Sequence, residues 1–321
     1  MTNVQGVQSN PNLSSYARLL GPSLGSFIAD QVFPTVEVPT LTGKFIDIDN
    51  GFASASPGHD IVMADGQERP LTIPLAFTRT TGWDVNQRGL GIRLDQRTKA
   101  ALGGEGIDMD QAATAILARH FLILKERLAA AVAFSATAFS GHTAALAGGD
   151  RWDTSTGDPI DDMMGAEEDM LSSSGAMLNT LIVGYQVHRK LRSSAQLINR
   201  LVWSGKAPGA LSVQQVKDAL GVENYFVGTA SSNTAVDGQA ASKSFIWGKS
   251  ALFCHIDAAP IPHSPQSALA RFKLRGSEDG AVKKYMLPGN YVEQMDMLAD
   301  DQYASPGGTS GLGYLYTTVV S

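Results

Sequence analysis

Two short glycine-containing segments carry fragments of a phosphate-binding motif. The sequence WGKS at 247–250 ends like a loop in which a lysine follows a glycine-rich turn and contacts phosphate oxygens. The first glycine of such a loop would fall at position 243, which is Lys243, so we interpret GKS as a tight turn between strands. The fragment GGTSGLG at 307–313 has no lysine at the required place and is interpreted as a loop.

One pentapeptide, GPSLG at 21–25, matches the GxSxG pattern of serine hydrolases. A nucleophilic serine in that pattern follows a strand and begins a helix, which exposes its hydroxyl on a sharp turn. Here a helical pattern comes before Ser23, and Pro22 lies beside it. The segment is therefore interpreted as a break between two short helices.

The residues Cys254, His255, Asp257 and His263 are all of types that bind metal ions. Cys254 and His255 fall in a predicted strand, where neighbouring side chains point to opposite faces and cannot easily share one ion. We therefore expect a buried thiol beside an exposed imidazole. A further histidine, His120, lies in the apolar stripe of a long helical pattern and is interpreted as a core or interface residue.

A run of carboxylates could form an acid–base site, and it comprises Asp158, Asp161, Asp162, Glu167, Glu168 and Asp169. Acidic residues also favour the first turn of a helix and its solvated face, which is the interpretation adopted here. The neighbouring methionines are interpreted as core packing, although a Met-rich face also suits an adaptable interface: Met163, Met164, Met170 and Met177. An α/β enzyme that uses the acidic cluster near Asp161 is a further alternative, but no arrangement of nucleophile, base and oxyanion donor can be assembled from the sequence.

The sequence thus predicts no catalytic residues, no cofactor-binding residues and no metal ligands, and a protein that is not an enzyme. Composition is consistent with this. The 321 residues carry a net charge of −6 without a dense basic run, so any contact with nucleic acid is expected to be weak and non-specific. The single cysteine excludes an internal disulfide framework and fits a reducing cytoplasm.

The N-terminal residues lack the basic-then-apolar pattern of a signal peptide, and no stretch approaches the ~20 apolar residues that span a membrane. A soluble protein that makes no membrane contact is therefore expected. Further along, Pro34 and Pro39 hold the segment VFPTVEVPT extended. Because no partner strand lies near it in the sequence, we expect this arm to lie across another surface.

Residues 43–86 are predicted to form two strands joined by a long polar excursion, with Ile46 and Ile48 alternating against aspartates. A two-stranded ribbon is marginally stable alone in water, so a neighbouring chain is the expected support. A surface hairpin on a monomeric domain is the alternative. The longest helical pattern follows at 108–134, with Asp108 and Asp110 in its first turn.

Short strands and helices then alternate through an α/β lobe. Asp158 followed by Pro159 predicts a helix start, and Gly175 a helix end. Ser212 with Gln215 predicts a capping box. The chain returns to strands in its last forty residues, from about Ala281.

The order of these elements, together with several local stretches, resembles the major capsid proteins of tailed bacteriophages, whose fold is shared with encapsulin shells. The stretches are QVFPTVEVPTLTGKFIDID, LKERLAAAVAF, WDTSTGDPIDDM, MLNTLIVG, YQVHRKLR, FIWGKSALF and LGYLYTTVVS. Each is weak alone, and together they cover nearly the whole chain in the expected order.

The resemblance implies an α+β fold with four parts. Residues 1–42 would form an N-terminal arm, and 43–86 an extended β-loop reaching over a neighbouring subunit. Residues 87–179 and 281–321 would form a peripheral domain with a spine helix at 108–134. Residues 180–280 would form an axial domain.

The implied function is self-assembly, as hexamers and pentamers, into the icosahedral shell of a virion that encloses double-stranded DNA. Portal, scaffold and decoration proteins would be partners, DNA would be contacted non-specifically, and assembly would occur in the host cytoplasm. An encapsulin-like compartment and another virion protein, such as a tail-tube subunit, are the alternatives.

Two departures from the family refine these expectations. The arm begins soon after Met1, which predicts a separate scaffold protein or none, and no large N-terminal cleavage. Between Lys44 and Lys99 the chain has no lysine, so the loop tip cannot supply one for covalent cross-linking. A non-covalent lattice is therefore expected.

Overall fold

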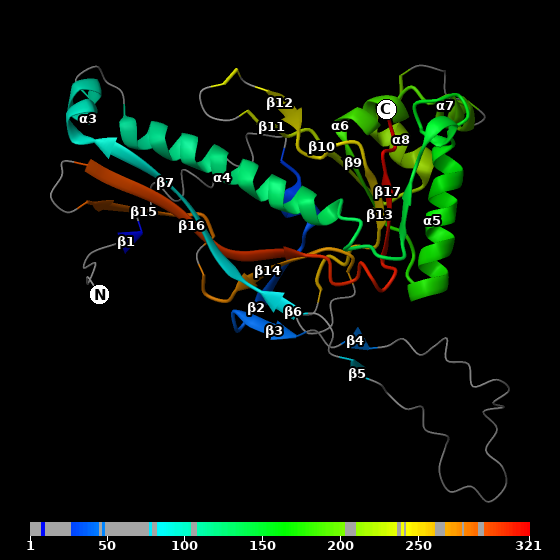
Figure 1. Ribbon diagram of the computed structural model, residues 1–321, viewed down its shortest axis with the longest axis horizontal. Helices are drawn as coiled ribbons and strands as arrows, with labels where there is room; N and C mark the ends of the chain where they lie inside the picture. The colour runs from blue at the N-terminus through cyan, green and yellow to red at the C-terminus, as the bar shows by residue number, and fades with distance from the viewer. Residues whose placement is uncertain are drawn as a thin grey trace, which may run out of the picture.

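In the described residues, the computed structural model has two larger sheets with helices packed against them, together with three two-stranded pairs (Figure 1). The α+β fold class predicted from the sequence is confirmed. The structure describes residues 8–9, 27–44, 47–48, 77–78, 82–103, 108–202, 210–235, 239–240, 242–260, 267–277, 279–287 and 292–321.

The first sheet, here called the β16 sheet, is organised around its longest strand. Its strands are β1 (Gln8–Ser9), β2 (Thr35–Val38), β7 (Asn86–Asp95), β14 (Ala270–Leu274), β15 (Ala281–Met286) and β16 (Val292–Ala304). One edge of β16 pairs with β7 from end to end, antiparallel. The other edge pairs first with β15 and then with β14, so two segments share one long strand.

The N-terminal arm joins this sheet. Strand β2 pairs in parallel with β14, with Val36 opposite Phe272, and both Val36 and Val38 are buried. The arm was expected to lie across another surface, whereas residues 35–38 pair with a strand of this chain's own β16 sheet. Its partner lies far away in the sequence, where no local pattern could reveal it.

Helix α4 (Met109–Ala133) lies across the β16 sheet, as Figure 1 shows, and confirms the helix predicted at 108–134. Asp108 is its N-cap and accepts hydrogen bonds from the backbone N–H groups of residues 110 and 111. The buried face is rich in alanine, which allows a close approach to the sheet: Ala113, Ala118, Ala129, Ala130 and Ala133, with Leu117 and Phe121. Ile116 and His120 are exposed, so His120 is not a core residue.

The second sheet, here called the β9 sheet, runs in the order β10 (Asn224–Gly228), β9 (Thr180–Gly184), β13 (Ala251–Cys254), β17 (Gly313–Thr317) and β8 (Thr143–Ala145). Both faces are covered, which explains why every residue of β9 is buried. Ile182 faces a cluster that includes α2 (Ala29–Val32) and the C-terminal end of α4.

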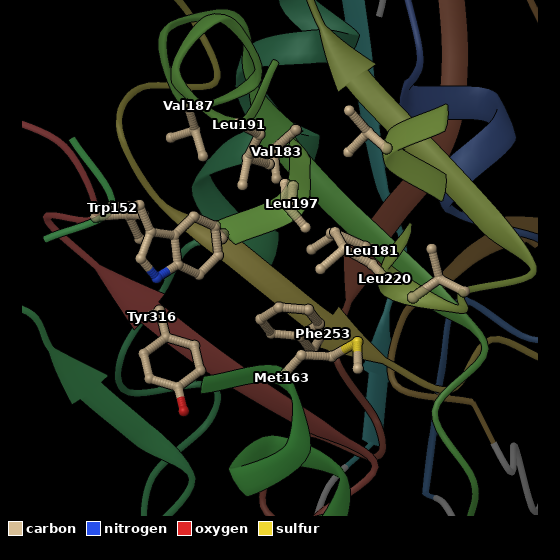
Figure 2. Close-up of a cluster of buried hydrophobic side chains, with 14 of the residues drawn as sticks. Trp152, Met163, Leu181, Val183, Val187, Leu191, Leu197, Leu220, Phe253 and Tyr316 are labelled. Atoms are coloured by element: carbon tan, nitrogen blue, oxygen red, sulfur yellow. The ribbon is translucent and has the colours of Figure 1, made fainter. Parts of the chain in front are cut away.

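The opposite face of the β9 sheet packs against four helices, α5 (Pro159–Ser174), α6 (Tyr185–Leu191), α7 (Ala195–Val202) and α8 (Val213–Leu220). Leu181, Phe253 and Tyr316 meet Trp152 and Met163 in this cluster, which Figure 2 shows. The alternation of side chains along each strand therefore divides the apolar residues between two separate cores.

The helix boundaries predicted in this lobe are confirmed. Asp158 caps α5 through a hydrogen bond from the Ile160 N–H to its carboxylate (2.9 Å), with Pro159 in the first turn. Gly175 ends α5 with φ of 70°, a conformation that costs a non-glycine residue energy. Ser212 and Gln215 form the predicted capping box of α8.

The predicted ribbon is present where the structure describes it. Strand β3 (Thr42–Lys44) pairs antiparallel with β6 (Gly82–Asp84), and β4 (Asp47–Ile48) pairs antiparallel with β5 (Phe77–Thr78). The polar excursion between them, at 49–76, lies outside the described residues. A separate hairpin, β11 (Ser231–Asn233) with β12 (Lys243–Phe245), follows β10.

The sheet pairings cross the expected boundary at residue 280. Strand β14, expected in the axial part, belongs to the β16 sheet, whereas β17, expected in the peripheral part, pairs with β13 in the β9 sheet. Helix α3 (Gln96–Gly103) lies beside β7 at the far end of the β16 sheet. The division into peripheral and axial domains stays a prediction.

Candidate functional site

The segments that carry catalytic motif fragments have structural roles. WGKS forms a turn between β12 and β13, as predicted, with Gly248 at φ of 54°. Trp247 is fully buried and its indole N–H donates to the carboxylate of Glu126. The segment 307–313 is a loop leading into β17, also as predicted. The segment 21–25 lies outside the described residues.

In the described part of the chain, the residues of types that bind metal ions do not gather at one site. Cys254 is fully buried, and burial raises the pKa of its thiol, which keeps it protonated and unreactive. His255 lies on the other side of the strand end, with its Nδ1 2.9 Å from the Met177 carbonyl oxygen. His263 is outside the described residues. Among the residues that the structure describes, no three His, Cys, Asp or Glu side chains gather into a possible metal site.

The acidic run separates into different environments. Asp158 caps α5, Asp162 accepts a hydrogen bond from the Trp152 indole (2.6 Å), and Asp169 contacts the His142 imidazole. Burial raises the pKa of Asp162, and nearby carboxylates add to that rise. Asp161 and Glu168 are exposed, and so are Met164 and Leu171 on the same side of the helix. The interpretation as first-turn and solvated charge agrees with this arrangement.

The methionines beside that run divide in the same way. Met163 and Met170 are buried, which confirms the expected core packing for these two. Met164 and Met177 are 54% and 64% exposed, so the core interpretation is wrong for them. Single exposed apolar side chains are common on protein surfaces, and they indicate a docking surface only where several form a contiguous patch.

The features of the described chain with a possible function are the ribbon, the arm and the surfaces that stay exposed. The base of the ribbon is fixed by Trp83, which is 3% exposed and stacks on Phe272 of β14 with ring centroids 6.1 Å apart. Its indole donates to the Thr40 carbonyl (3.0 Å), and Gly43 lies directly against the ring. The ribbon therefore leaves the β16 sheet from a rigid support.

The arm is fixed by a buried carboxylate. Glu126 on α4 is fully buried, and its Oε1 accepts a hydrogen bond from the Ala29 N–H (2.6 Å) at the start of α2. Its Oε2 accepts the Trp247 indole N–H. Burial raises the pKa of Glu126, while these hydrogen bonds oppose the rise. One side chain thus joins the arm, the long helix and the turn beside the β9 sheet.

A buried ion network continues from this point. Arg271 on β14 lies 2.6 Å from Asp301 on β16, 2.8 Å from Asp279 and 3.4 Å from Asp30 on α2. Lys125 on α4 lies 3.2 Å from Asp279. Although burial opposes it, Lys125 and Arg271 hold the pKa of Asp279 below its ordinary value. Arg271 and Asp301 are almost completely buried, so their charges need compensation within the fold; Asp301 also lies 3.5 Å from Arg88.

A second, more exposed network lies at the far end of the β16 sheet. Lys99 on α3 and Lys284 on β15 each lie within 3.0 Å of both Asp110 and Glu293. Although burial opposes it, the two lysines lower the pKa values of both carboxylates. The network joins α3, α4, β15 and β16. Sequence reasoning missed both ion networks. The only local sign of them is a charged residue within an otherwise apolar stretch.

Several large apolar side chains remain exposed on the described surface. They are Leu41, Ile116, Met164, Leu171, Met177, Tyr185, Val213, Phe245 and Met286. Leu41 lies at the base of the ribbon, and Tyr185 and Phe245 form a ring pair with centroids 5.3 Å apart. No helix of the described residues has the length and apolar character needed to cross a membrane.

Comparison with known proteins finds no matching family model and no matching curated protein. Solved structures do match over the whole chain. A phage-related protein from Bordetella bronchiseptica RB50 matches with a TM-score of 0.73 at 19% identity, covering 98% of this chain and 99% of that one. A candidate prophage capsid protein from Escherichia coli CFT073 matches with a TM-score of 0.53 at 13% identity, over 97% and 99%.

The encapsulin of the holo-SrpI complex from Synechococcus elongatus PCC 7942 matches with a TM-score of 0.51 at 10% identity, over 100% and 94%. The chain has the fold shared by tailed-phage capsid proteins and encapsulins. At these identities the likeness concerns the capsid fold alone. The resemblance inferred from the order of the sequence elements is confirmed at that level.

Proposed function

We propose that this chain is the major capsid protein of a tailed bacteriophage, and that it assembles into the icosahedral shell around packaged double-stranded DNA. The observation that carries the proposal is the capsid fold, which extends over nearly the full length of both this chain and the matching structures. Because the match covers 98% of this chain and 99% of the phage-related structure, assembly is the function that the chain supports best.

The projecting segments support the same proposal. The ribbon leaves the β16 sheet at Trp83, whose buried contacts fix its base, while the described part of the arm is held against α4 by Glu126. A ribbon of two short strands is marginally stable in water, so contact with a neighbouring copy would stabilise it. The exposed apolar side chains of the described surface would be buried by the same contacts.

The role is structural, and the partners follow from it. Copies of the chain would form hexamers and pentamers, with a portal protein and, where used, scaffold and decoration proteins, first in the host cytoplasm and then in the virion. The lattice is proposed to be non-covalent. The chain's net charge of −6 suits an inner surface that tolerates DNA without binding it tightly.

Electron microscopy of the purified chain, alone and with the candidate scaffold from the neighbouring genes, tests the proposal. Closed shells, or rings of five and six, are the expected result, and light scattering gives their mass. A chain that stays monomeric or dimeric under all of these conditions would overturn it. Open tubes would instead support a tail-tube subunit.

An encapsulin-like compartment is the second candidate, because an encapsulin matches the whole chain about as well as the E. coli prophage protein does. The contents of native particles separate the two. Particles captured with an antibody against the chain are expected to contain nuclease-resistant double-stranded DNA of uniform length. Particles that contain one class of cargo protein and no protected DNA would support the compartment instead.

A further inference from the structure

Two faces of the β9-sheet lobe are unpartnered in the described chain, and the first lies on α5. Met164 and Leu171 are 54% and 44% exposed and lie seven residues apart, which places them on one side of the helix. Asp161 and Glu168 are exposed on the same side of the helix, each three residues before Met164 and Leu171 respectively. The helix contains five carboxylates and no lysine or arginine. This surface, here called the acidic face, combines an apolar centre with a negative border.

The second face lies on α6 and the β11–β12 hairpin. Tyr185 and Phe245 are 40% and 38% exposed and contact each other through their rings. Arg189 follows Tyr185 by one helical turn, and Lys243 precedes Phe245 on the same side of β12; both are exposed. The segment 185–202 contains four lysines and arginines and no carboxylate. This surface, here called the basic face, combines an aromatic centre with a positive border.

The acidic face and the basic face lie too far apart to contact each other within one chain. Strand order places β10 at one end of the β9 sheet and β17 and β8 at the other. Helix α5 contacts the β17 end, where the Tyr316 hydroxyl donates to the Asp162 carbonyl (2.9 Å), whereas α6 and the hairpin lie toward the β10 end. Figure 1 shows α5 and β12 on opposite sides of the lobe. The ion pairs of the described residues include none between α5 and either α6 or β12.

We propose that the acidic face of one copy docks against the basic face of the next copy, so that the lobes join head to tail in a ring. The proposal rests on the proposed function, since it supposes that copies assemble. Contact between two different faces of identical chains generates a closed ring when the rotation between copies closes. Buried apolar centres would supply affinity, and the opposite charges at the border would set the orientation and exclude like-to-like pairing.

Charge reversal of each face gives a specific test. An acid-reversed chain carries Asp161→Lys and Glu168→Lys, and a base-reversed chain carries Arg189→Glu and Lys243→Glu. Each alone is expected to need at least about tenfold higher concentration than the wild type to form rings or shells, because like charges then meet at every contact. A chain with all four substitutions is expected to return to within about threefold of the wild type, because it restores opposite charges across the contact.

Mixing sharpens the test. The acid-reversed chain has two positive faces and the base-reversed chain two negative faces, so neither pairs with itself but each pairs with the other. An equimolar mixture is expected to form even-membered rings of alternating chains, seen by native mass spectrometry. A five-membered ring cannot alternate and should be absent from the mixture.

The matched control combines the acid-reversed substitutions with Arg97→Glu and Arg119→Glu, at exposed sites outside both faces. It has the same net charge as the four-substitution chain and is expected not to recover assembly. Recovery by this control, or wild-type assembly of the reversed chains, would overturn the head-to-tail contact. If the wild type itself never assembles, the proposed function fails instead. Circular dichroism verifies that every variant is folded.

Discussion

Replacing Trp83 by alanine tests whether the ribbon is fixed by its base. The side chain is 3% exposed, stacks on Phe272 and donates a hydrogen bond to the Thr40 carbonyl. Truncating a buried tryptophan costs about 3–5 kcal/mol of unfolding free energy, because the cavity left behind only partly collapses. The stacked ring pair accounts for roughly 0.5–1.5 kcal/mol of this and the hydrogen bond for a similar amount.

The matched control is Trp83→Phe, which keeps a ring against Phe272 but loses the indole N–H. We expect it to cost about 1–2 kcal/mol, from the lost hydrogen bond and the smaller side chain. Guanidinium denaturation of the unassembled chain, followed by circular dichroism, measures both differences. Because domains of this kind are stable by only about 5–15 kcal/mol, the alanine variant should unfold at visibly lower denaturant.

Assembly gives a second readout for the same variants. If the Trp83 contact directs the ribbon, the alanine variant should assemble less well than the phenylalanine variant at concentrations where both are folded. A loss of less than about 1 kcal/mol for Trp83→Ala would refute the reasoning, because a well-packed buried tryptophan cannot be removed so cheaply. If the two variants assemble equally well, the Trp83 contact stabilises the base of the ribbon but does not direct the ribbon.

Three further changes probe the contacts that hold the arm and the lobe. Burial raises the pKa of Glu126 above its ordinary value of 4.5, so this carboxylate binds a proton more tightly in the folded chain than in the unfolded chain. The free energy of unfolding of the wild type should therefore rise relative to that of Glu126→Gln as the pH falls toward 4.5. A difference between the two chains that does not change with pH would contradict this. Arg271→Met should lower the free energy of unfolding by about 3–5 kcal/mol, because among the described residues it leaves the buried Asp301 with the longer ion pair to Arg88 (3.5 Å) alone, and adding Asp301→Asn should recover part of the loss. Gly228→Ala places a methyl group against the Trp247 ring and should cost about 1–3 kcal/mol, whereas an unchanged melting temperature would show that the ring can move aside.

The contacts around Glu126 and Arg271 also bear on how assembly could be coupled to folding. The arm reaches the core through Ala29 and Asp30, which meet these two networks on neighbouring residues. Asp30 is half exposed, so this end of the network lies at the surface where the arm enters. A change in the arm would therefore alter the contacts of buried charged groups in the β16 sheet. Leaving such a group without a counter-charge lowers the free energy of unfolding.

Local signals predicted the elements with good accuracy where neighbouring residues decide the structure. The first turn of α4 at Asp108, the start of α5 at Asp158 and the capping box at Ser212 all depend on hydrogen bonds within three residues. The ribbon strands around 42–48 and 77–84 follow from alternation along each strand. Position 243 is a lysine where a phosphate-binding loop needs its first glycine, so the sequence excluded such a loop and predicted a turn at GKS.

The buried face of α4 shows where such reasoning stopped. Large apolar residues predicted a stripe through Ile116 and His120, but the structure buries the alanines and leaves these two exposed. Alanine carries little hydrophobic signal in a sequence, yet its small size allows the closest approach of a helix to a sheet. The choice between the two faces depends on the shape of the β16 sheet, which comes from strands elsewhere in the chain.

The sequence alone therefore determined the capped ends of α4, α5 and α8, that no recognisable catalytic motif is complete, and, through the order of elements, the capsid fold. Only the tertiary structure decided that β2 pairs with β14 and that β17 joins β13. It also decided that the buried Glu126 accepts a hydrogen bond from Ala29 and that Arg271 pairs with Asp301. The physical reason is range. Caps and turns are decided by hydrogen bonds between neighbours, whereas strand partners and buried charges are decided by burial, to which residues far apart in the chain contribute together.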